Sequence, residues 1–153
     1  MNNIPARELA IREIIYGSIE YETAVALRAA ILRQPLGLKF TPEQLQAEQN
    51  QHHIACYYQG NLAACLVLKP GLAHTIVMRQ VAVTPALQGK GIGKALIKFA
   101  EEFALQHHYS AIILHARATA IPFYEKQGYK CRGKFFEEIS LPHREMYKKL
   151  LAS

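Results

Sequence analysis

A glycine-rich stretch at residues 88–94 (Gln-Gly-Lys-Gly-Ile-Gly-Lys) constrains this chain more than any other segment. It follows an alternating apolar segment at residues 79–83, typical of a strand, and it opens a run with helical periodicity. Glycines let the backbone turn tightly and approach a ligand closely. The first N–H groups of a helix lack partners within the helix, and its dipole favours negative charge there. The stretch therefore predicts a phosphate-binding loop, and the alternative is an ordinary glycine-rich turn.

The glycine spacing excludes two familiar phosphate-binding motifs. A P-loop needs a serine or threonine after its Gly-Lys pair to bind magnesium, but Gly93-Lys94 is followed by Ala95. A dinucleotide-binding fingerprint has the spacing Gly-x-Gly-x-x-Gly early in a βαβ unit. Here the spacing is Gly-x-Gly-x-Gly, past the middle of the chain. A different phosphate-bearing ligand is therefore expected.

A second informative segment, residues 120–129, reads Ala-Ile-Pro-Phe-Tyr-Glu-Lys-Gln-Gly-Tyr. It predicts a short helix that ends at Gly128, after which Tyr129 enters a strand. Taken alone, Tyr124 could be a core aromatic residue with a satisfied hydroxyl. Together, and in this order, the two segments resemble the pyrophosphate loop and the Phe-Tyr-Glu-Lys-x-Gly segment of the GCN5-related N-acetyltransferases (GNAT). Residues 27–28, 32–37 and 141–146 are similar to a bacterial branch of GNAT-family N-acyltransferases.

Periodicity and turn signals predict an alternating set of strands and helices. Strands are expected at residues 9–16, 53–58, 62–69, 75–83, 111–116, 129–135 and 144–150, and helices at 20–33, 42–50, 91–106 and 119–127. Thr41 to Gln44 form a capping-box sequence. In the third helix Lys98, Glu101 and Glu102 should face water. The resemblance implies an α/β (α+β) GNAT fold: a mixed central sheet of about seven strands, splayed in the middle and flanked by four helices, in one domain over residues 1–153.

Composition narrows the function classes. The 153 residues carry a formal net charge of +6, which favours acidic ligands. Lysines and arginines are scattered along the chain, so only the net charge supports the hypothesis of a nucleic-acid-binding domain. No nucleic-acid partner is therefore expected. Cys56, Cys65 and Cys131 lie in apolar segments without metal spacing and are expected to be reduced. We see neither a signal peptide nor a membrane-spanning run, so a cytoplasmic protein without a membrane partner or a metal is expected.

The resemblance implies acetyl-CoA as co-substrate. In the family this ligand lies where two parallel strands part, which correspond here to residues 75–83 and 111–116. The implied coenzyme-binding residues are Val81, Ala82, Val83, Gln88, Gly89, Lys90, Gly91, Ile92, Gly93, Lys94, Arg117, Phe123 and Lys126. The backbone near Val81 would stabilise the oxyanion of the tetrahedral intermediate. Arg117 stands where many members carry an asparagine, so its placement can differ.

The implied reaction is direct acyl transfer to an amine, with Tyr124 as the general acid that protonates the leaving thiolate. Many members carry a glutamate base on the central strand, but residues 79–83 contain no carboxylate. The general base is therefore undecided. It is His115, His143, Glu138 or a water chain, or else no base is needed because the amine arrives neutral. Strand alternation places His115 on one face with Ile113 and Arg117. A core histidine at 115 and a structural turn residue at 143 are the alternatives.

The acceptor is expected to be a primary amine of a small molecule or a peptide, with Arg28, Gln80 and Glu138 as substrate-binding candidates. A lone arginine in an apolar helix needs a partner, so Arg28 could bind an acceptor carboxylate or pair with an internal glutamate, which we favour. The competing function is a non-catalytic acyl-CoA-binding or regulatory module. Neither the acceptor, the acyl preference nor a homodimer follows from the sequence.

Overall fold

The computed structural model describes residues 2–150, and its contacts divide the chain into two compact units. Unit 1 comprises residues up to 69 together with 80–100, and unit 2 comprises residues 70–79 and those from 101 onward. Strand β4 (Thr75–Val83) and helix α3 (Ile92–Gln106) each contribute residues to both units. A single domain over residues 1–153 stays a prediction, and the two units are described one at a time.

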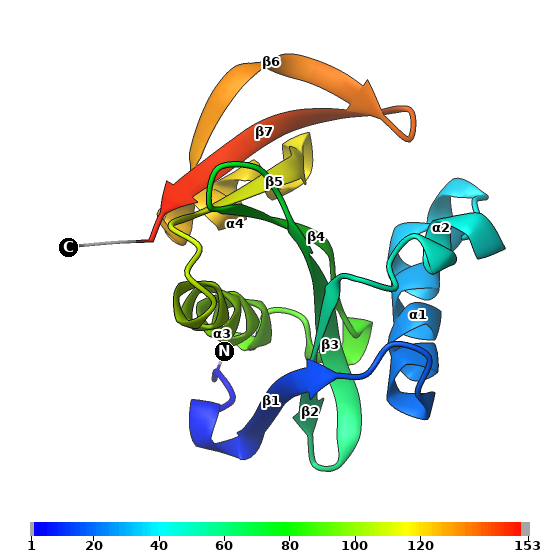
Figure 1. The fold of residues 1–153 in the computed structure, drawn as a ribbon. Coiled ribbons are helices and arrows are strands. Elements are labelled where there is room, and N and C mark those ends of the chain that lie inside the picture. The colour runs from blue at the N-terminus through cyan, green and yellow to red at the C-terminus, as the bar shows by residue number, and fades with distance from the viewer. Residues whose placement is uncertain (1, 151–153) are drawn as a thin grey trace. The chain divides into compact units, whose positions relative to one another are not determined.

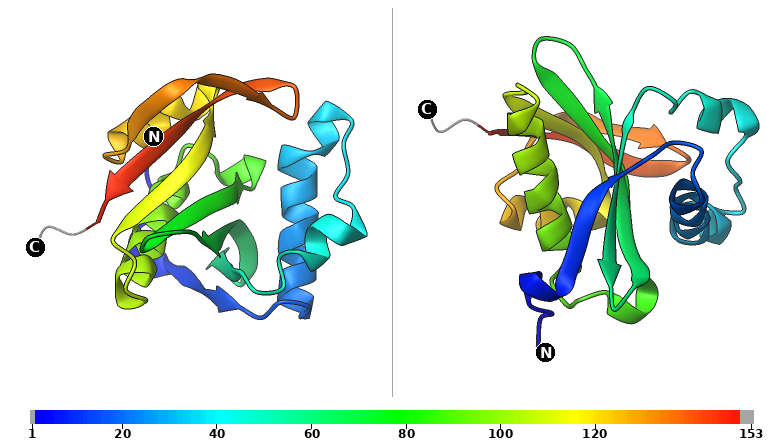
Figure 2. Two further views of the ribbon diagram at one scale, coloured as in Figure 1. Left: turned by 45° about the horizontal axis from the view of Figure 1, so that its top comes forward. Right: turned by 60° about the horizontal axis from the view of Figure 1, so that its bottom comes forward.

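Unit 1 is built on an antiparallel arrangement of three strands. These are β1 (Leu9–Ile14), β2 (His52–Tyr58) and β3 (Asn61–Pro70). Gln59 and Gly60 both have positive φ, 52° and 82°, as a two-residue hairpin turn requires. Helix α1 (Ile19–Leu32) packs on the strands (Figures 1 and 2), and its Tyr21 and Ala24 join a core that includes Ile14, Ala55 and Cys65.

Local capping sets where the helices of unit 1 begin. The Ser18 hydroxyl accepts a hydrogen bond from the Tyr21 N–H, and the predicted capping box of Thr41 and Gln44 is present in full. Helix α2 (Pro42–Gln46) ends four residues earlier than expected, so the prediction of a helix that runs to residue 50 was wrong. Residues 47–50 form turns, in which the Glu48 N–H donates to the Leu45 carbonyl at 3.0 Å. These turns direct the Glu48 side chain inward, where it is buried.

Unit 2 contains the start of β4, strand β5 (Ala111–Arg117), helix α4 (Ile121–Lys126) and the hairpin of β6 (Lys130–Glu138) and β7 (Leu141–Lys149). Parallel pairing of β4 with β5 covers Thr75–Val77 and Ala111–Ile113. Strand β7 pairs antiparallel with β5 and with β6 (Figure 1). The hairpin turns at Ile139 and Ser140, which have φ of 48° and 62°.

The order β1-α1-α2-β2-β3-β4-α3-β5-α4-β6-β7 and the sheet order β1-β2-β3-β4-β5-β7-β6 confirm the predicted GNAT fold. The last two strands are longer at their shared turn than predicted, by three residues each (135 to 138, and 144 to 141). Ile139-Ser140 lacks the glycine or proline that usually marks a tight turn. Consequently, Glu138 and His143 lie in strands and not in a loop.

Helix α3 buries one apolar stripe, which includes Ile92, Leu96 and Phe103. The prediction that Glu101 faces water was wrong, because its side chain is only 17% exposed. The carboxylate accepts hydrogen bonds from Lys148 Nζ at 3.1 Å and from the Tyr129 hydroxyl at 2.9 Å. Within residues 2–150, no helix is both long enough and apolar enough to cross a membrane.

Candidate active site

The predicted phosphate loop lies in unit 1, immediately before α3. Gly89 and Gly91 have φ of 78° and 84°, the left-handed region where glycine costs least. Gln88 Nε2 donates to the Val83 carbonyl at 3.1 Å, which ties the loop to the end of β4. The loop thus leads directly from a strand to the first turn of a helix, as the sequence indicates.

The N-terminal segment braces this loop, a feature that sequence reasoning missed. The Ile4 N–H donates to the Lys90 carbonyl at 2.9 Å. A Cβ atom added at Gly91 would lie 3.0 Å from Asn3 Cγ, closer than side-chain contacts normally are. A substitution at Gly91 would therefore meet both an unfavourable φ and a steric neighbour. No local pattern in residues 3–4 indicates this contact.

The end of β4 is irregular at a predicted substrate-binding residue. Gln80 has a φ of 58°, an uncommon value for a residue other than glycine. Its side-chain Oε1 is buried and accepts no hydrogen bond from the residues that the structure describes. Ala82 is buried in the core of unit 1, whereas Val81 and Val83 are half-buried. Ala82 can therefore offer a ligand only its backbone.

Tyr124 lies on α4 in unit 2 and is only 9% exposed. Burial raises the pKa of its phenol to about 12, so the hydroxyl is protonated at neutral pH. The ring forms edge contacts with Phe123 and Tyr129, at centroid distances of 5.2 and 5.9 Å. Its hydroxyl makes no hydrogen bond to another described residue of unit 2. The group is thus a buried proton donor that can serve an external acceptor.

The structure brings together the three residues that we considered as bases. His115 Nδ1 lies 3.0 Å from Glu138 Oε1, and His143 Nε2 lies 3.8 Å from Glu138 Oε2. The Phe136 ring packs against both imidazoles. His115 is 43% exposed and is not a core histidine. His143 is buried in strand β7, so the turn position considered for it was wrong.

Hydrogen-bond chemistry assigns the tautomers of both imidazoles. Carboxylate and carbonyl oxygens only accept, so His115 Nδ1–H donates to Glu138 and His143 Nδ1–H donates to the Leu141 carbonyl at 2.8 Å. In the neutral form of each ring, the lone pair therefore lies on Nε2. The accessible one belongs to His115, and Glu145 Oε1 lies 3.9 Å from it.

Glu145 and Arg132 complete this cluster and were missed from the sequence. Glu145 lies opposite His115 in the β5–β7 register, and its other oxygen accepts a hydrogen bond from Arg132 Nε. Strand periodicity predicts the face of a residue, but only the register shows which residue lies opposite. The carboxylate therefore became visible only once the strands were paired.

The remaining charged candidates were predicted to bind coenzyme or substrate, and one of them, Arg117, lies opposite His143 in the β5–β7 register. Arg28 pairs in unit 1 with Glu48, the internal partner that we favoured. Arg117 precedes the 3₁₀ turn η4 (Ala118–Ala120) and is half-buried, while Lys94 and Lys126 are exposed.

Burial raises the pKa of the Cys56 thiol to about 11 and that of Cys65 to about 12, and both are free thiols. Within the described residues, no group of three or more histidine, cysteine, aspartate or glutamate side chains is arranged so that it could hold a metal ion.

Residues 22–129 match the model of the acetyltransferase (GNAT) family, so the chain belongs to this family. It is 28% identical over 115 residues to Probable N-acetyltransferase 14 of Xenopus tropicalis. The aligned region covers 72% of this chain, and this chain spans only 55% of the length of that relative. It is 25% identical over 132 residues to a Bacillus subtilis protein described as an acetyltransferase, covering 84% of this chain and 89% of the relative.

Solved structures agree with the family. A Lactobacillus plantarum protein described as an N-acetyltransferase superposes with a TM-score of 0.84 at 27% identity, covering 94% of this chain and 99% of that one. An aminoglycoside 6′-N-acetyltransferase in complex with coenzyme A has a TM-score of 0.80 at 16% identity, covering 94% of this chain and 98% of that one. The second likeness shows the shared fold alone.

Proposed function

We propose that this chain is an acetyl-CoA-dependent N-acetyltransferase that transfers the acyl group directly to a primary amine of a small molecule or a peptide. The observation that carries the proposal is the loop at residues 88–91, with two left-handed glycines directly before α3. Such a loop aims backbone N–H groups at a ligand, and a helix N-terminus favours the negative charge of a pyrophosphate.

In the proposed reaction the base takes a proton from the amine, the amine attacks the thioester carbonyl carbon, and the carbon–sulfur bond then breaks. The Val81 backbone is the proposed donor to the oxyanion of the intermediate, and such a donor contributes about 10²–10³ in rate. Tyr124 donates its proton as the thiolate leaves. Its burial keeps the phenol protonated, which this role needs.

We assign the base to His115, with Glu138 as its positioning residue. The Nδ1–H bond to Glu138 at 3.0 Å fixes the ring and leaves Nε2 to accept the proton of the attacking amine. The carboxylates of Glu138 and Glu145 stabilise the imidazolium that forms. In this proposal His115 takes the role of the base, because residues 79–83 contain no carboxylate that could take it.

Calorimetric titration with acetyl-CoA tests the cofactor assignment. We expect saturable binding that the Gly91→Val variant weakens by about 10²-fold, because the loss of charge-assisted backbone hydrogen bonds costs about 1.5–3 kcal/mol each. Gly60→Val is the matched control, since Gly60 has a similar φ of 82° and open space around it. Equal weakening by both variants, or no binding by the wild type, would contradict the assignment. Binding without thiol release from any amine would favour the non-catalytic acyl-CoA-binding module instead.

Loss of the base should make the rate follow the fraction of the acceptor amine that is already neutral. We expect the His115→Gln variant to lower kcat/KM near neutral pH by about 10²–10⁴. Without a base the reaction needs an amine that is already neutral. Since an alkyl amine has a pKa of about 10.4, kcat/KM of the variant should rise about tenfold per pH unit below that value.

A pH series of initial rates measures this dependence. His108→Gln serves as the control, because His108 is an exposed histidine of unit 2 outside the cluster. A variant with the wild-type rate and the wild-type pH slope would remove His115 from the mechanism.

A further inference from the structure

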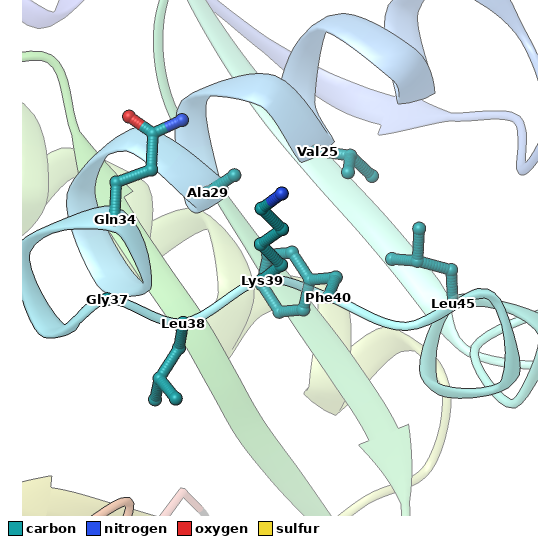
Figure 3. Close-up of a pocket in the computed structure, with 8 residues that line it drawn as sticks. All are labelled: Val25, Ala29, Gln34, Gly37, Leu38, Lys39, Phe40 and Leu45. Carbon is teal, nitrogen blue, oxygen red and sulfur yellow. The ribbon is translucent and has the colours of Figure 1, made fainter.

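Unit 1 contains a cavity of about 450 Å³ between helix α1, the segment 34–40 and helix α2 (Figure 3). Its lining residues are Val25, Ala29, Gln34, Gly37, Leu38, Lys39, Phe40 and Leu45. Cavities that hold small ligands measure about 300–1,000 Å³ and are mostly apolar with a few polar groups. This cavity has both properties, and neither the loop nor the histidine cluster contributes to it.

The cavity has an apolar body and a polar rim. Val25, Ala29, Phe40 and Leu45 supply apolar surface, and no carboxylate side chain is among the lining residues. Figure 3 shows the Gln34 amide and the Lys39 ammonium extending to the same side as Ala29, whereas Leu38 points the other way. Among the described residues of unit 1, neither the Lys39 ammonium nor the Gln34 side-chain amide has an ion-pair or hydrogen-bond partner. The rim therefore offers a positive charge and an amide that a ligand can use.

The aromatic wall of the cavity is held in place by cations. The guanidinium carbons of Arg28 and Arg33 lie 4.8 and 4.7 Å from the centroid of the Phe40 ring. Arg28 is itself held by its buried pair with Glu48. A turn at Gly37, with a φ of 70°, leads the chain into this wall. The cavity is thus largely formed before any ligand binds, which lowers the entropic cost of binding.

We infer that this cavity binds a small carboxylic acid with an apolar body, whose carboxylate contacts Lys39 and Gln34 while its hydrocarbon lies against Ala29, Phe40 and Leu45. An ammonium–carboxylate hydrogen bond is stronger than a neutral one, so the anion provides the selectivity. The inference does not depend on acetyl transfer, and a failure of the acetyl-CoA titration would leave it standing.

Three probes of equal length test it: hexanoate, hexanol and hexylamine. Calorimetry should show that hexanoate binds about tenfold more tightly than hexanol, because it adds one charge-assisted hydrogen bond, with hexylamine weakest. In methyl NMR spectra of the wild type, hexanoate should shift the signals of Val25 and Leu45 and leave Leu114 of unit 2 unchanged. Equal binding of the three probes, or shifts confined to other methyl groups, would overturn the inference.

Two substitutions locate the two parts of the site. Lys39→Met should reduce hexanoate affinity about tenfold, to the level of hexanol, and leave hexanol binding unchanged. Lys69→Met removes an exposed lysine of unit 1 outside the cavity and should change neither. Ala29→Phe fills the cavity and should abolish binding of both probes, with a thermal melt to show that the variant is folded. Unchanged hexanoate affinity in Lys39→Met contradicts the proposal even if Ala29→Phe fails to fold.

Discussion

Replacing Tyr124 with phenylalanine is expected to lower kcat for acetyl transfer by about 10²–10⁴ and to leave acetyl-CoA affinity nearly unchanged. The variant keeps the ring and its edge contacts with Phe123 and Tyr129, so the packing of α4 should survive. It loses only the hydroxyl, which makes no hydrogen bond to another residue in the part of unit 2 that the structure describes. The loss therefore falls on the transition state, where the departing thiolate needs a proton.

Thiol release under saturating acetyl-CoA measures this effect, and calorimetry measures the affinity. Tyr129→Phe is the matched control, because it removes a neighbouring hydroxyl that donates to Glu101 and has no proposed catalytic role. We expect this control to lower the stability of unit 2 while keeping kcat within about threefold, less than about 1 kcal/mol in the barrier. Full activity of Tyr124→Phe, or equal losses in both variants, would remove Tyr124 from the mechanism.

Replacing Glu48 with alanine should destabilise unit 1 by about 3–5 kcal/mol, because it leaves a buried arginine without its counter-ion. Arg28 and Glu48 are 1% and 2% exposed, and they form a two-pronged pair in which Arg28 Nη1 donates to Glu48 Oε1 at 2.8 Å. The Tyr21 hydroxyl donates to the same oxygen at 3.0 Å. Burial, and then the Glu48 charge, raise the pKa of Tyr21.

Urea unfolding measures the loss, and a double variant separates charge from packing. Arg28→Met with Glu48→Leu removes both charges, keeps the volume and should recover most of the stability. Glu43→Ala, at an exposed position of α2, should change stability by less than about 0.5 kcal/mol. A loss below about 1 kcal/mol in Glu48→Ala would mean that Arg28 finds another partner. The double variant also tests a role of Arg28 in acceptor binding, since an unchanged acceptor KM would assign Arg28 to structure alone.

The two family segments could be predicted because their signals are local. Glycines at 89 and 91 have the positive φ that the loop requires, and Thr41 with Gln44 forms the capping box that their spacing predicts. Such features depend on the conformational preferences of a few consecutive residues. Local signals also predicted the order of strands and helices, and the family resemblance of the two segments implied the fold.

Contacts between distant residues could not be predicted in this way. The turns that follow the second helix bury Glu48, and its carboxylate pairs with Arg28, which lies 20 residues away in the sequence. Glu101 of α3 is largely covered and does not face water, because its carboxylate pairs with Lys148. In both cases a buried or half-buried charge found its partner in space, and burial without such a partner would be costly.

By itself, the sequence determined the glycine loop before α3 and the short helix that carries Tyr124, since each depends on local backbone preference and periodicity. Through its resemblance to a known family, the sequence also indicated the fold. Only the tertiary structure decided which side chains meet. Strand register placed Glu145 opposite His115, a tight turn without glycine put Glu138 beside both histidines, and the N-terminal segment came to brace Gly91. The physical reason is that periodicity fixes the face on which a side chain lies, whereas register and chain closure fix its neighbour on that face.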